Sequence, residues 1–137
     1  MAFVPIHSRD RARQLVSFEG MELGERAWPT DFDAVVEWRN IAWVVFEVKH
    51  GGKDVPRGQR LALERFVADV CRGGKMALAA VVEHHVDDPA EDVVLARCRV
   101  REVYVGGQNR WRLPNRDMDA RECMELWLEY ATGRRNA

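Results

Sequence analysis

The chain has 137 residues, of which 47% are hydrophobic and 31% charged, and its formal net charge is −1. This balance excludes a disordered chain and predicts a soluble protein that buries one core. No apolar stretch approaches the length of a membrane span, and the N-terminus lacks a signal-peptide core. We therefore expect a cytoplasmic protein with no membrane partner. Three cysteines, far apart and odd in number, predict reduced thiols.

In chain order, residues 9–17 are expected to form a short amphipathic helix, with Ser8 as a candidate N-cap. Residues 31–38 and 43–50 then read as strands, because both are rich in β-branched and aromatic side chains. The short polar connection Arg39-Asn40 predicts that they form an antiparallel hairpin. The second strand is apolar on both faces until its end, which is typical of a central strand covered by helices on both sides.

Charged side chains gather where this hairpin ends. Glu47 and Lys49 share one face of the second strand, because side chains on a strand alternate. The hairpin brings Asp33, at the start of the first strand, opposite Glu47. Two carboxylates converging beside a buried lysine are unfavourable without a cation. Mg²⁺ removes the conflict, since it binds one or two carboxylates together with waters and phosphate oxygens.

A helix is predicted after Pro56, a residue that suits a first turn, and it ends at Gly73-Gly74. Its inward stripe has helical spacing and starts with a polar residue: Gln59, Leu63, Phe66, Val67 and Val70. A glutamine on the inward side at the N-terminal end predicts contact with the metal site. The alternative is that Gln59 caps local backbone groups.

The remaining segments complete an α/β fold. Residues 75–82 read as a third buried strand, and residues 93–105 and 108–113 as a hairpin that turns at Gly106-Gly107. Acidic residues crowd between Glu83 and Asp92 in an expected solvated loop. A helix is predicted over residues 117–131, with fraying at Arg134-Arg135. Its expected apolar side consists of Cys123, Leu126, Trp127, Tyr130 and Ala131.

The set formed by Asp33, Glu47-Val48-Lys49 and Gln59 resembles the PD-(D/E)xK nuclease superfamily, whose members share the restriction-endonuclease-like fold. The stretches 29–33 and 58–64 are similar to small phage-type and Holliday-junction-resolvase-like members. The resemblance covers about residues 18–85. It implies a mixed central sheet flanked by helices in a single domain over residues 1–137, with its core at about 18–113. A phage-encoded member would work in the cytoplasm of the host cell.

The resemblance also implies a role for each residue. Asp33 and Glu47 would bind Mg²⁺ or Mn²⁺, with the main-chain carbonyl of Val48 completing the set. Lys49 would orient or activate the attacking water and offset charge on the phosphate, and Gln59 would position the water or the lysine. These roles agree with the chemistry, since a metal supplies Lewis acidity and fixed charge stabilises the phosphate as it gains charge.

The sequence departs from the family pattern at Thr30, which stands between Pro29 and the acids. Asp31 and Asp33 share a strand face, so either can be the ligand; Asp33 is favoured because the apolar strand follows it directly. Related nucleases often carry a further helical acid before the first strand. Three candidates are present, with no basis for choosing among them: Glu19, Glu22 and Glu25.

The function predicted is metal-dependent hydrolysis of nucleic-acid phosphodiesters, with DNA favoured because the similar nucleases cut DNA. Lys53, Arg57 and Arg60 flank the site in sequence and are the expected phosphate contacts. The alternation of Arg97, Arg99 and Arg101 would line one strand face. The rival hypothesis is an inactive nuclease-fold module that binds nucleic acid or protein, and either form can be a homodimer.

Four further residues could in principle take part in such a site, but we favour other roles for them. His84 and His85 are neighbours on a strand and point oppositely, so we expect them on the surface rather than on a metal. His50 follows Lys49 and is a weaker candidate for a place near the phosphate. Trp111 is expected to pack on the sheet rather than to stack on a base.

Overall fold

The computed structural model describes residues 17–21 and 31–136, and the chain divides into two units at Thr30. In the first unit the described part is a turn, closed by a hydrogen bond from the Met21 amide to the Phe18 carbonyl. Of the helix predicted over residues 9–17, residues 9–16 and the candidate cap Ser8 lie outside the described residues. The same holds for Glu22, Glu25, Pro29 and Thr30.

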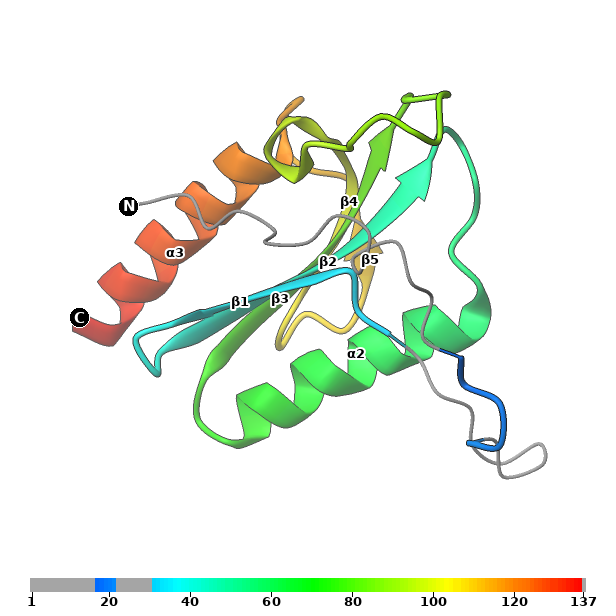
Figure 1. Cartoon of the computed structure of the whole chain (residues 1–137). Helices are drawn as coiled ribbons and strands as arrows, with labels where there is room; N and C mark the ends of the chain where they lie inside the picture. Colours follow the sequence, from blue (N-terminus) through cyan, green and yellow to red (C-terminus); the bar gives the residue numbers. More distant parts are fainter. Residues whose placement is uncertain (1–16, 22–30, 137) are drawn as a thin grey trace. The chain divides into compact units, whose positions relative to one another are not determined.

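The second unit contains a five-stranded mixed sheet in the order β1-β2-β3-β4-β5 (Figure 1). Strands β2 and β3 are parallel, and every other neighbouring pair is antiparallel. The elements are β1 Ala34–Trp38, β2 Ala42–His50, α2 Arg57–Arg72, β3 Met76–His84, the 3₁₀ helix η1 Leu95–Arg97, β4 Arg99–Val105, β5 Trp111–Arg112 and α3 Ala120–Asn136. The predicted α/β class and mixed sheet are confirmed. No helix in the described ranges has both the length and the apolar character needed to cross a membrane.

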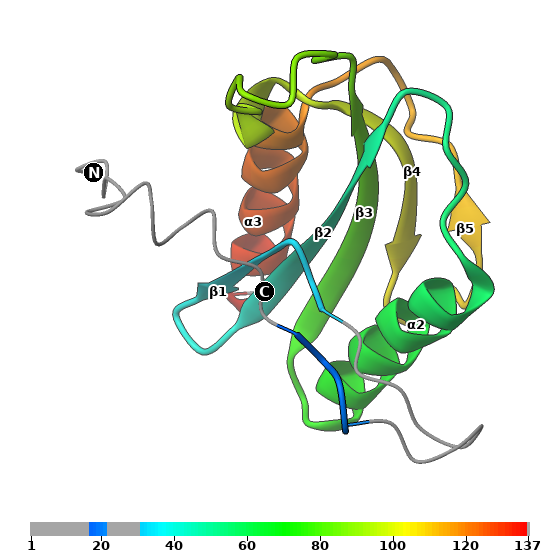
Figure 2. The ribbon, with the colours of Figure 1, turned by 45° about the vertical axis from the view of Figure 1, so that its right-hand side comes forward.

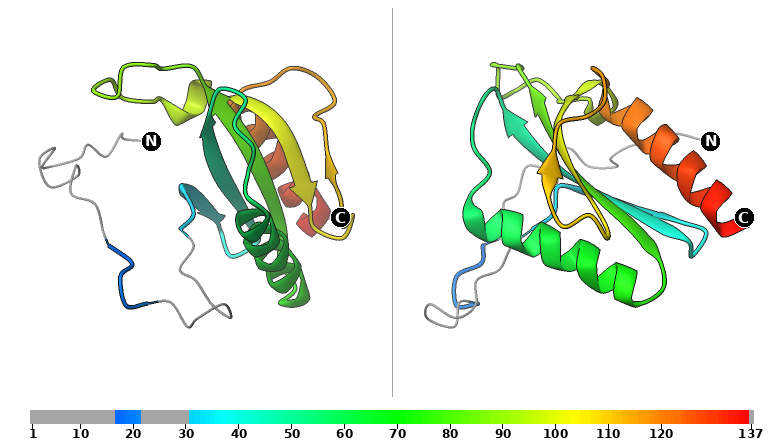
Figure 3. Two further views of the ribbon diagram at one scale, coloured as in Figure 1. Left: turned by 90° about the vertical axis from the view of Figure 1, so that its right-hand side faces the viewer. Right: turned by 180° about the vertical axis from the view of Figure 1, so that it is seen from behind.

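The helices α2 and α3 cover opposite faces of the sheet (Figure 2). On one face, Leu63 and Val67 of α2 pack against buried residues of β2, β3 and β4. On the other face, Cys123 and Trp127 of α3 pack against a second set. Since β2 contributes to both cores, it is the central, doubly covered strand that its sequence predicts. Figure 3 shows the same layers from two further sides, with β1 and β5 at the sheet's edges.

A tight turn joins β1 to β2. Arg39 and Asn40 both have positive φ, 48° and 59°, and the Ile41 amide donates to the Trp38 carbonyl at 2.8 Å. Two consecutive left-handed residues are the mark of a type I′ turn, whose twist suits a hairpin. The predicted hairpin is confirmed. The prediction that its first strand starts at residue 31 is wrong, because β1 begins at Ala34.

Helix α2 follows its prediction closely. It begins at Arg57, directly after Pro56, and ends before Gly73 and Gly74. Gly74 has φ of 85°, a conformation that glycine adopts without steric cost at a helix end. The predicted inward stripe is confirmed, with Leu63 and Val67 as its buried centre.

The segment around β3 and β4 differs from prediction in two ways. Strand β3 continues to His84, so Glu83 belongs to a strand rather than to a solvated loop. Residues 95–97 form a 3₁₀ turn, closed by a hydrogen bond from the Arg97 amide to the Val94 carbonyl, and β4 begins only at Arg99. The predicted strand from residue 93 was therefore too long, and Arg97 is not on a strand face with Arg99.

Helix α3 is displaced from the predicted range of 117–131. Asp119 accepts a hydrogen bond from the Glu122 amide at 2.9 Å, so it caps the helix and sets its start at Ala120. The helix then continues through Asn136, against the predicted fraying at Arg134-Arg135. On the predicted apolar side of this helix, Leu126 and Tyr130 are exposed, at 41% and 54%, whereas Cys123, Trp127 and Ala131 are buried.

Candidate functional site

The candidate site lies at the end of β2, on the face covered by α2. The hairpin pairs Ala34 with Phe46, and one further step of this register places Asp33 beside Glu47. The Asp33 carboxylate accepts a hydrogen bond from the Val48 amide at 2.7 Å. The Asp33 side chain thus takes the place of a backbone hydrogen bond to β2, just before β1 begins at Ala34. The contact fixes Asp33 next to the Glu-x-Lys segment.

Glu47 is buried, with 3% of its surface exposed. Among the residues that the structure describes, it is the one charged residue that is buried. Burial raises the pKa of its carboxyl, and the neighbouring charge of Asp33 raises it further. The hydrogen bond and charge of Lys49 oppose this shift, and Asp31 adds a weaker upward effect. The site thus holds more negative charge than one lysine neutralises.

Lys49 joins the strand to the helix. Its ammonium lies 3.2 Å from the Glu47 carboxylate and donates to the side-chain oxygen of Gln59 at 3.0 Å. Gln59 stands in the first turn of α2, in line with the buried residues Leu63 and Val67. The structure thus brings Asp33, Glu47, Lys49 and Gln59 together, as the sequence predicted. Gln59 contacts the lysine rather than capping local backbone.

The donor atoms suit a hard cation. No group of three or more histidine, cysteine, aspartate or glutamate side chains that could hold a metal occurs in the described part of the chain. The oxygens available are the carboxylates of Asp33 and Glu47, and the Val48 carbonyl stays a predicted third donor. A set with few protein oxygens suits Mg²⁺ or Mn²⁺, which keep several waters, and does not suit zinc, which prefers nitrogen and sulfur.

The two candidate aspartates have different surroundings. Asp33 accepts the Val48 amide and is the main charged neighbour that raises the pKa of Glu47. Both aspartates are exposed, but the effect of Asp31 on the pKa of Glu47 is the smallest of the causes. The geometry therefore favours Asp33 as the partner of Glu47 in any cation site.

The predicted phosphate contacts fall into two groups. Lys53 and Arg57 are exposed, and so are open to solution. Their contact with nucleic-acid phosphates stays a prediction. Arg60 pairs with Glu102, and its guanidinium lies 4.9 Å from the ring centroid of Trp111. It is therefore directed toward the sheet rather than toward solution. Trp111 itself packs on Tyr104, with ring centroids 5.3 Å apart, which confirms its assignment to the sheet.

His50 and His84 lie together at the same end of the sheet, with ring centroids 5.1 Å apart. His50 also contacts the carboxylate of Asp87 at 3.0 Å. Because strand side chains alternate, His50 points to the face opposite Glu47 and Lys49. The structure thus separates these histidines from the candidate site.

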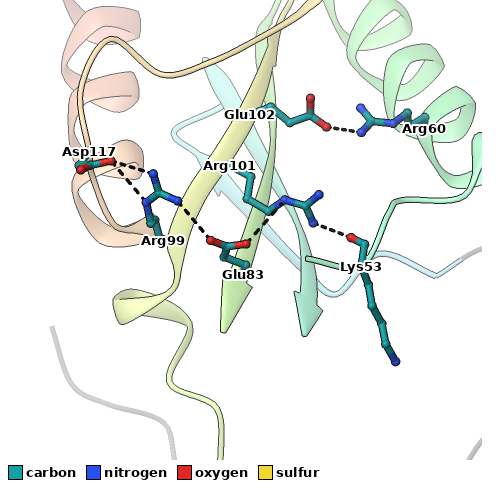
Figure 4. Close-up of polar contacts among 7 residues, drawn as sticks. All are labelled: Lys53, Arg60, Glu83, Arg99, Arg101, Glu102 and Asp117. Carbon is teal, nitrogen blue, oxygen red and sulfur yellow. Dashed lines mark hydrogen bonds and ion pairs between the residues drawn. The ribbon is translucent and has the colours of Figure 1, made fainter. Parts of the chain in front are cut away.

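A charged cluster next to the site was not recognised in the sequence (Figure 4). Arg101 donates to the Lys53 main-chain carbonyl at 2.6 Å and lies 3.8 Å from the carboxylate of Glu83. Arg99 lies 3.3 Å from Glu83 and 3.0 Å from Asp117. The alternation of arginines in the sequence indicated a row of side chains free to contact phosphate. In the structure, carboxylates and a main-chain carbonyl instead bind the guanidinium groups of Arg99 and Arg101.

Scans against family models, curated proteins and solved structures find no match for this chain. The functional argument therefore depends on the geometry of the residues themselves.

Proposed function

We propose that this protein is a divalent-metal-dependent nuclease of the PD-(D/E)xK type, with a restriction-endonuclease-like arrangement, that hydrolyses phosphodiester bonds in DNA. The observation that supports this most directly is the convergence of Asp33, Glu47, Lys49 and Gln59 at the end of β2. These residues come from two strand ends and a helix, so their convergence depends on the fold and not on sequence proximity alone.

The burial of Glu47 adds to this support. A carboxylate that is almost fully buried beside a second carboxylate is costly for the folded protein. Proteins retain such strained charge mostly where it has a use, and perturbed acids cluster at functional sites. A bound Mg²⁺ or Mn²⁺ would relieve the conflict and would supply a Lewis acid and a template for the phosphate.

The residues of the chain then divide the remaining tasks. Asp33 and Glu47 hold the cation, and the Val48 amide keeps Asp33 in place. The ammonium of Lys49 has three N–H donors. Glu47 and Gln59 engage two of them, which leaves one for the attacking water or a phosphate oxygen. The positive charge of Lys49 also stabilises the phosphate as negative charge develops on it.

A cleavage assay tests the proposal. The protein is incubated with linear, nicked, branched and single-stranded DNA, and with RNA, in Mg²⁺, Mn²⁺ or EDTA. We expect cleavage that requires the metal and falls at least about a hundredfold in Glu47→Ala and in Lys49→Ala, the size typical for removal of a fixed catalytic charge. Glu129→Ala, an exposed change on α3, is the matched control.

Cleavage that persists in EDTA, or that survives both site variants, would refute the mechanism. Binding without cleavage on every substrate would favour the rival hypothesis, an inactive module that binds nucleic acid. Sedimentation of the same preparations decides whether the protein is the predicted homodimer or a monomer.

A further inference from the structure

Arg101 occupies an irregular position in β4. In the pairing of β3 with β4, Val81 lies opposite Glu102 and Val82 lies opposite Val100. Arg101 is thus the extra residue of a β-bulge. Bulges bend the strand and redirect the side chain of the extra residue, and they are frequent next to active sites. Here the bulge turns Arg101 toward the end of β2, between Glu83 and Lys53 (Figure 4).

The guanidinium of Arg101 connects three parts of the chain. It donates to the Lys53 carbonyl in the β2–α2 loop and lies within ion-pair distance of Glu83 in β3. The Arg101 side chain is 20% exposed and that of Glu83 is 13% exposed, so water screens the pair only partly. The planar guanidinium can serve both acceptors at once, which a lysine ammonium does with less fixed geometry.

Lys53 stands in the segment that joins the two halves of the candidate site. Lys49 ends this segment on the strand side, and Gln59 ends it on the helix side. Further contacts hold the segment in place, because the Gly51 amide donates to the His84 carbonyl at 2.8 Å and Val55 is buried. A shift of this loop would change the contact between the Lys49 ammonium and the Gln59 side chain.

We infer that Arg101 is a positioning residue for the proposed active site. By holding the Lys53 carbonyl, with Glu83 as its anchor, it fixes the β2–α2 loop and so keeps Gln59 against Lys49. Arg101 does not touch the reacting atoms in this scheme. Its catalytic consequence rests on the proposed nuclease function, whereas its effect on the loop does not.

Arg99 provides a matched control. It also contacts Glu83, but its second partner is Asp117 rather than the loop, and its side chain is 61% exposed. Removal of Arg99 therefore takes one positive charge from Glu83 and leaves the Lys53 contact intact. A difference between the two arginines isolates the contact with the loop.

The first measurement is amide hydrogen exchange in metal-free protein. We expect the Gly51 amide to exchange at least about tenfold faster in Arg101→Met and in Arg101→Lys, since methionine has no donor and lysine cannot hold the Lys53 carbonyl and Glu83 together in the fixed geometry of the guanidinium. Exchange should stay close to wild type in Arg99→Met. Arg101→Lys keeps the charge, so it serves if Arg101→Met fails to fold. Unchanged exchange in Arg101→Lys would overturn the inference, whether or not the protein cuts nucleic acid.

The second measurement is a double-mutant cycle on the cleavage rate. Arg101→Lys should lower kcat roughly ten- to hundredfold with little change in KM, because a small misplacement of catalytic groups has an effect of this size. In the Gln59→Ala background the same substitution should have little further effect. Additive losses, or an equal loss in Arg99→Met, would show that Arg101 does not act through the loop and Gln59. Absence of cleavage in wild type would refute the nuclease proposal alone and leave the exchange result to decide.

Discussion

Replacing Glu47 by glutamine removes a buried charge from the site and keeps the shape of the side chain. Burial and the nearby Asp33 raise the pKa of Glu47, against the opposing effect of Lys49. Without a divalent cation, the ionised carboxylate therefore makes the folded state less stable. We predict that Glu47→Gln has a higher free energy of unfolding than wild type in EDTA at alkaline pH.

The sign and the pH window follow from linkage. A carboxyl with a raised pKa in the folded protein holds its proton more tightly there than in the unfolded chain. Stability therefore falls as the pH rises from the ordinary value of 4.5 to the raised value, and it stays lower above that. Glutamine has no proton to lose. The advantage of the variant should be absent below about pH 4 and complete in alkaline solution.

We expect the stabilisation to be about 0.5–2 kcal/mol, the size typical of a single stabilising substitution. For a domain of this size it corresponds to a Tm increase of roughly 2–9 °C. Addition of Mn²⁺ should reverse the order. A cation at a hundredfold excess over its Kd stabilises the wild type by about 2.7 kcal/mol, whereas the variant has lost a ligand.

Thermal unfolding followed by circular dichroism measures both effects, in EDTA and in Mn²⁺, at about pH 4 and about pH 8. Glu129→Gln changes the net charge equally at an exposed position and should show neither effect. If Glu47→Gln is less stable than wild type in EDTA at alkaline pH, the pairing with Lys49 outweighs burial, and our account of the site's electrostatics is wrong.

Three further predictions concern other parts of the unit. Asp33→Ala should lower cleavage at least about a hundredfold, whereas Asp31→Ala should stay within a few-fold; the opposite order in a cleavage assay would reassign the ligand. Gly106→Ala should destabilise the protein by about 1–3 kcal/mol, because the added methyl meets the Cys71 sulfur. Urea unfolding should show partial rescue by Cys71→Ala, and additive effects would contradict the clash. Trp127→Phe loses a hydrogen bond to the backbone of β2 and should cost roughly 1–2 kcal/mol; an unchanged urea midpoint would show that this bond contributes nothing.

The parts of the fold that could be predicted are those with strong local patterns. The residues before Gly51 are mostly β-branched and aromatic, so the sequence predicts β2. The apolar residues at helical spacing before Gly73 predict α2. These two elements carry Glu47, Lys49 and Gln59. Most of the candidate site was therefore predictable, because its residues stand on the best-defined elements of the chain.

The parts that were missed depend on tertiary contacts. The 3₁₀ turn at residues 95–97 takes Arg97 out of the strand, and the bulge adds Arg101 as an extra residue of β4. Neither composition nor periodicity marks such an insertion. Helix α3 starts later than predicted because Asp119, and not an earlier polar residue, provides the capping oxygen. Several polar residues precede this helix, and the sequence does not distinguish among them.

The tight turn at Arg39 and Asn40 has a consequence for how this chain tolerates insertions and deletions. Adding or removing one residue there would slip β1 by one position along its neighbour and send Asp33 to the opposite side of the sheet. Surface loops far from the site should accept extra residues with little loss of activity, whereas this exposed turn should accept none. A scan of single-residue insertions along the chain should therefore find an inactive but folded variant here, distant in space from the chemistry that it abolishes.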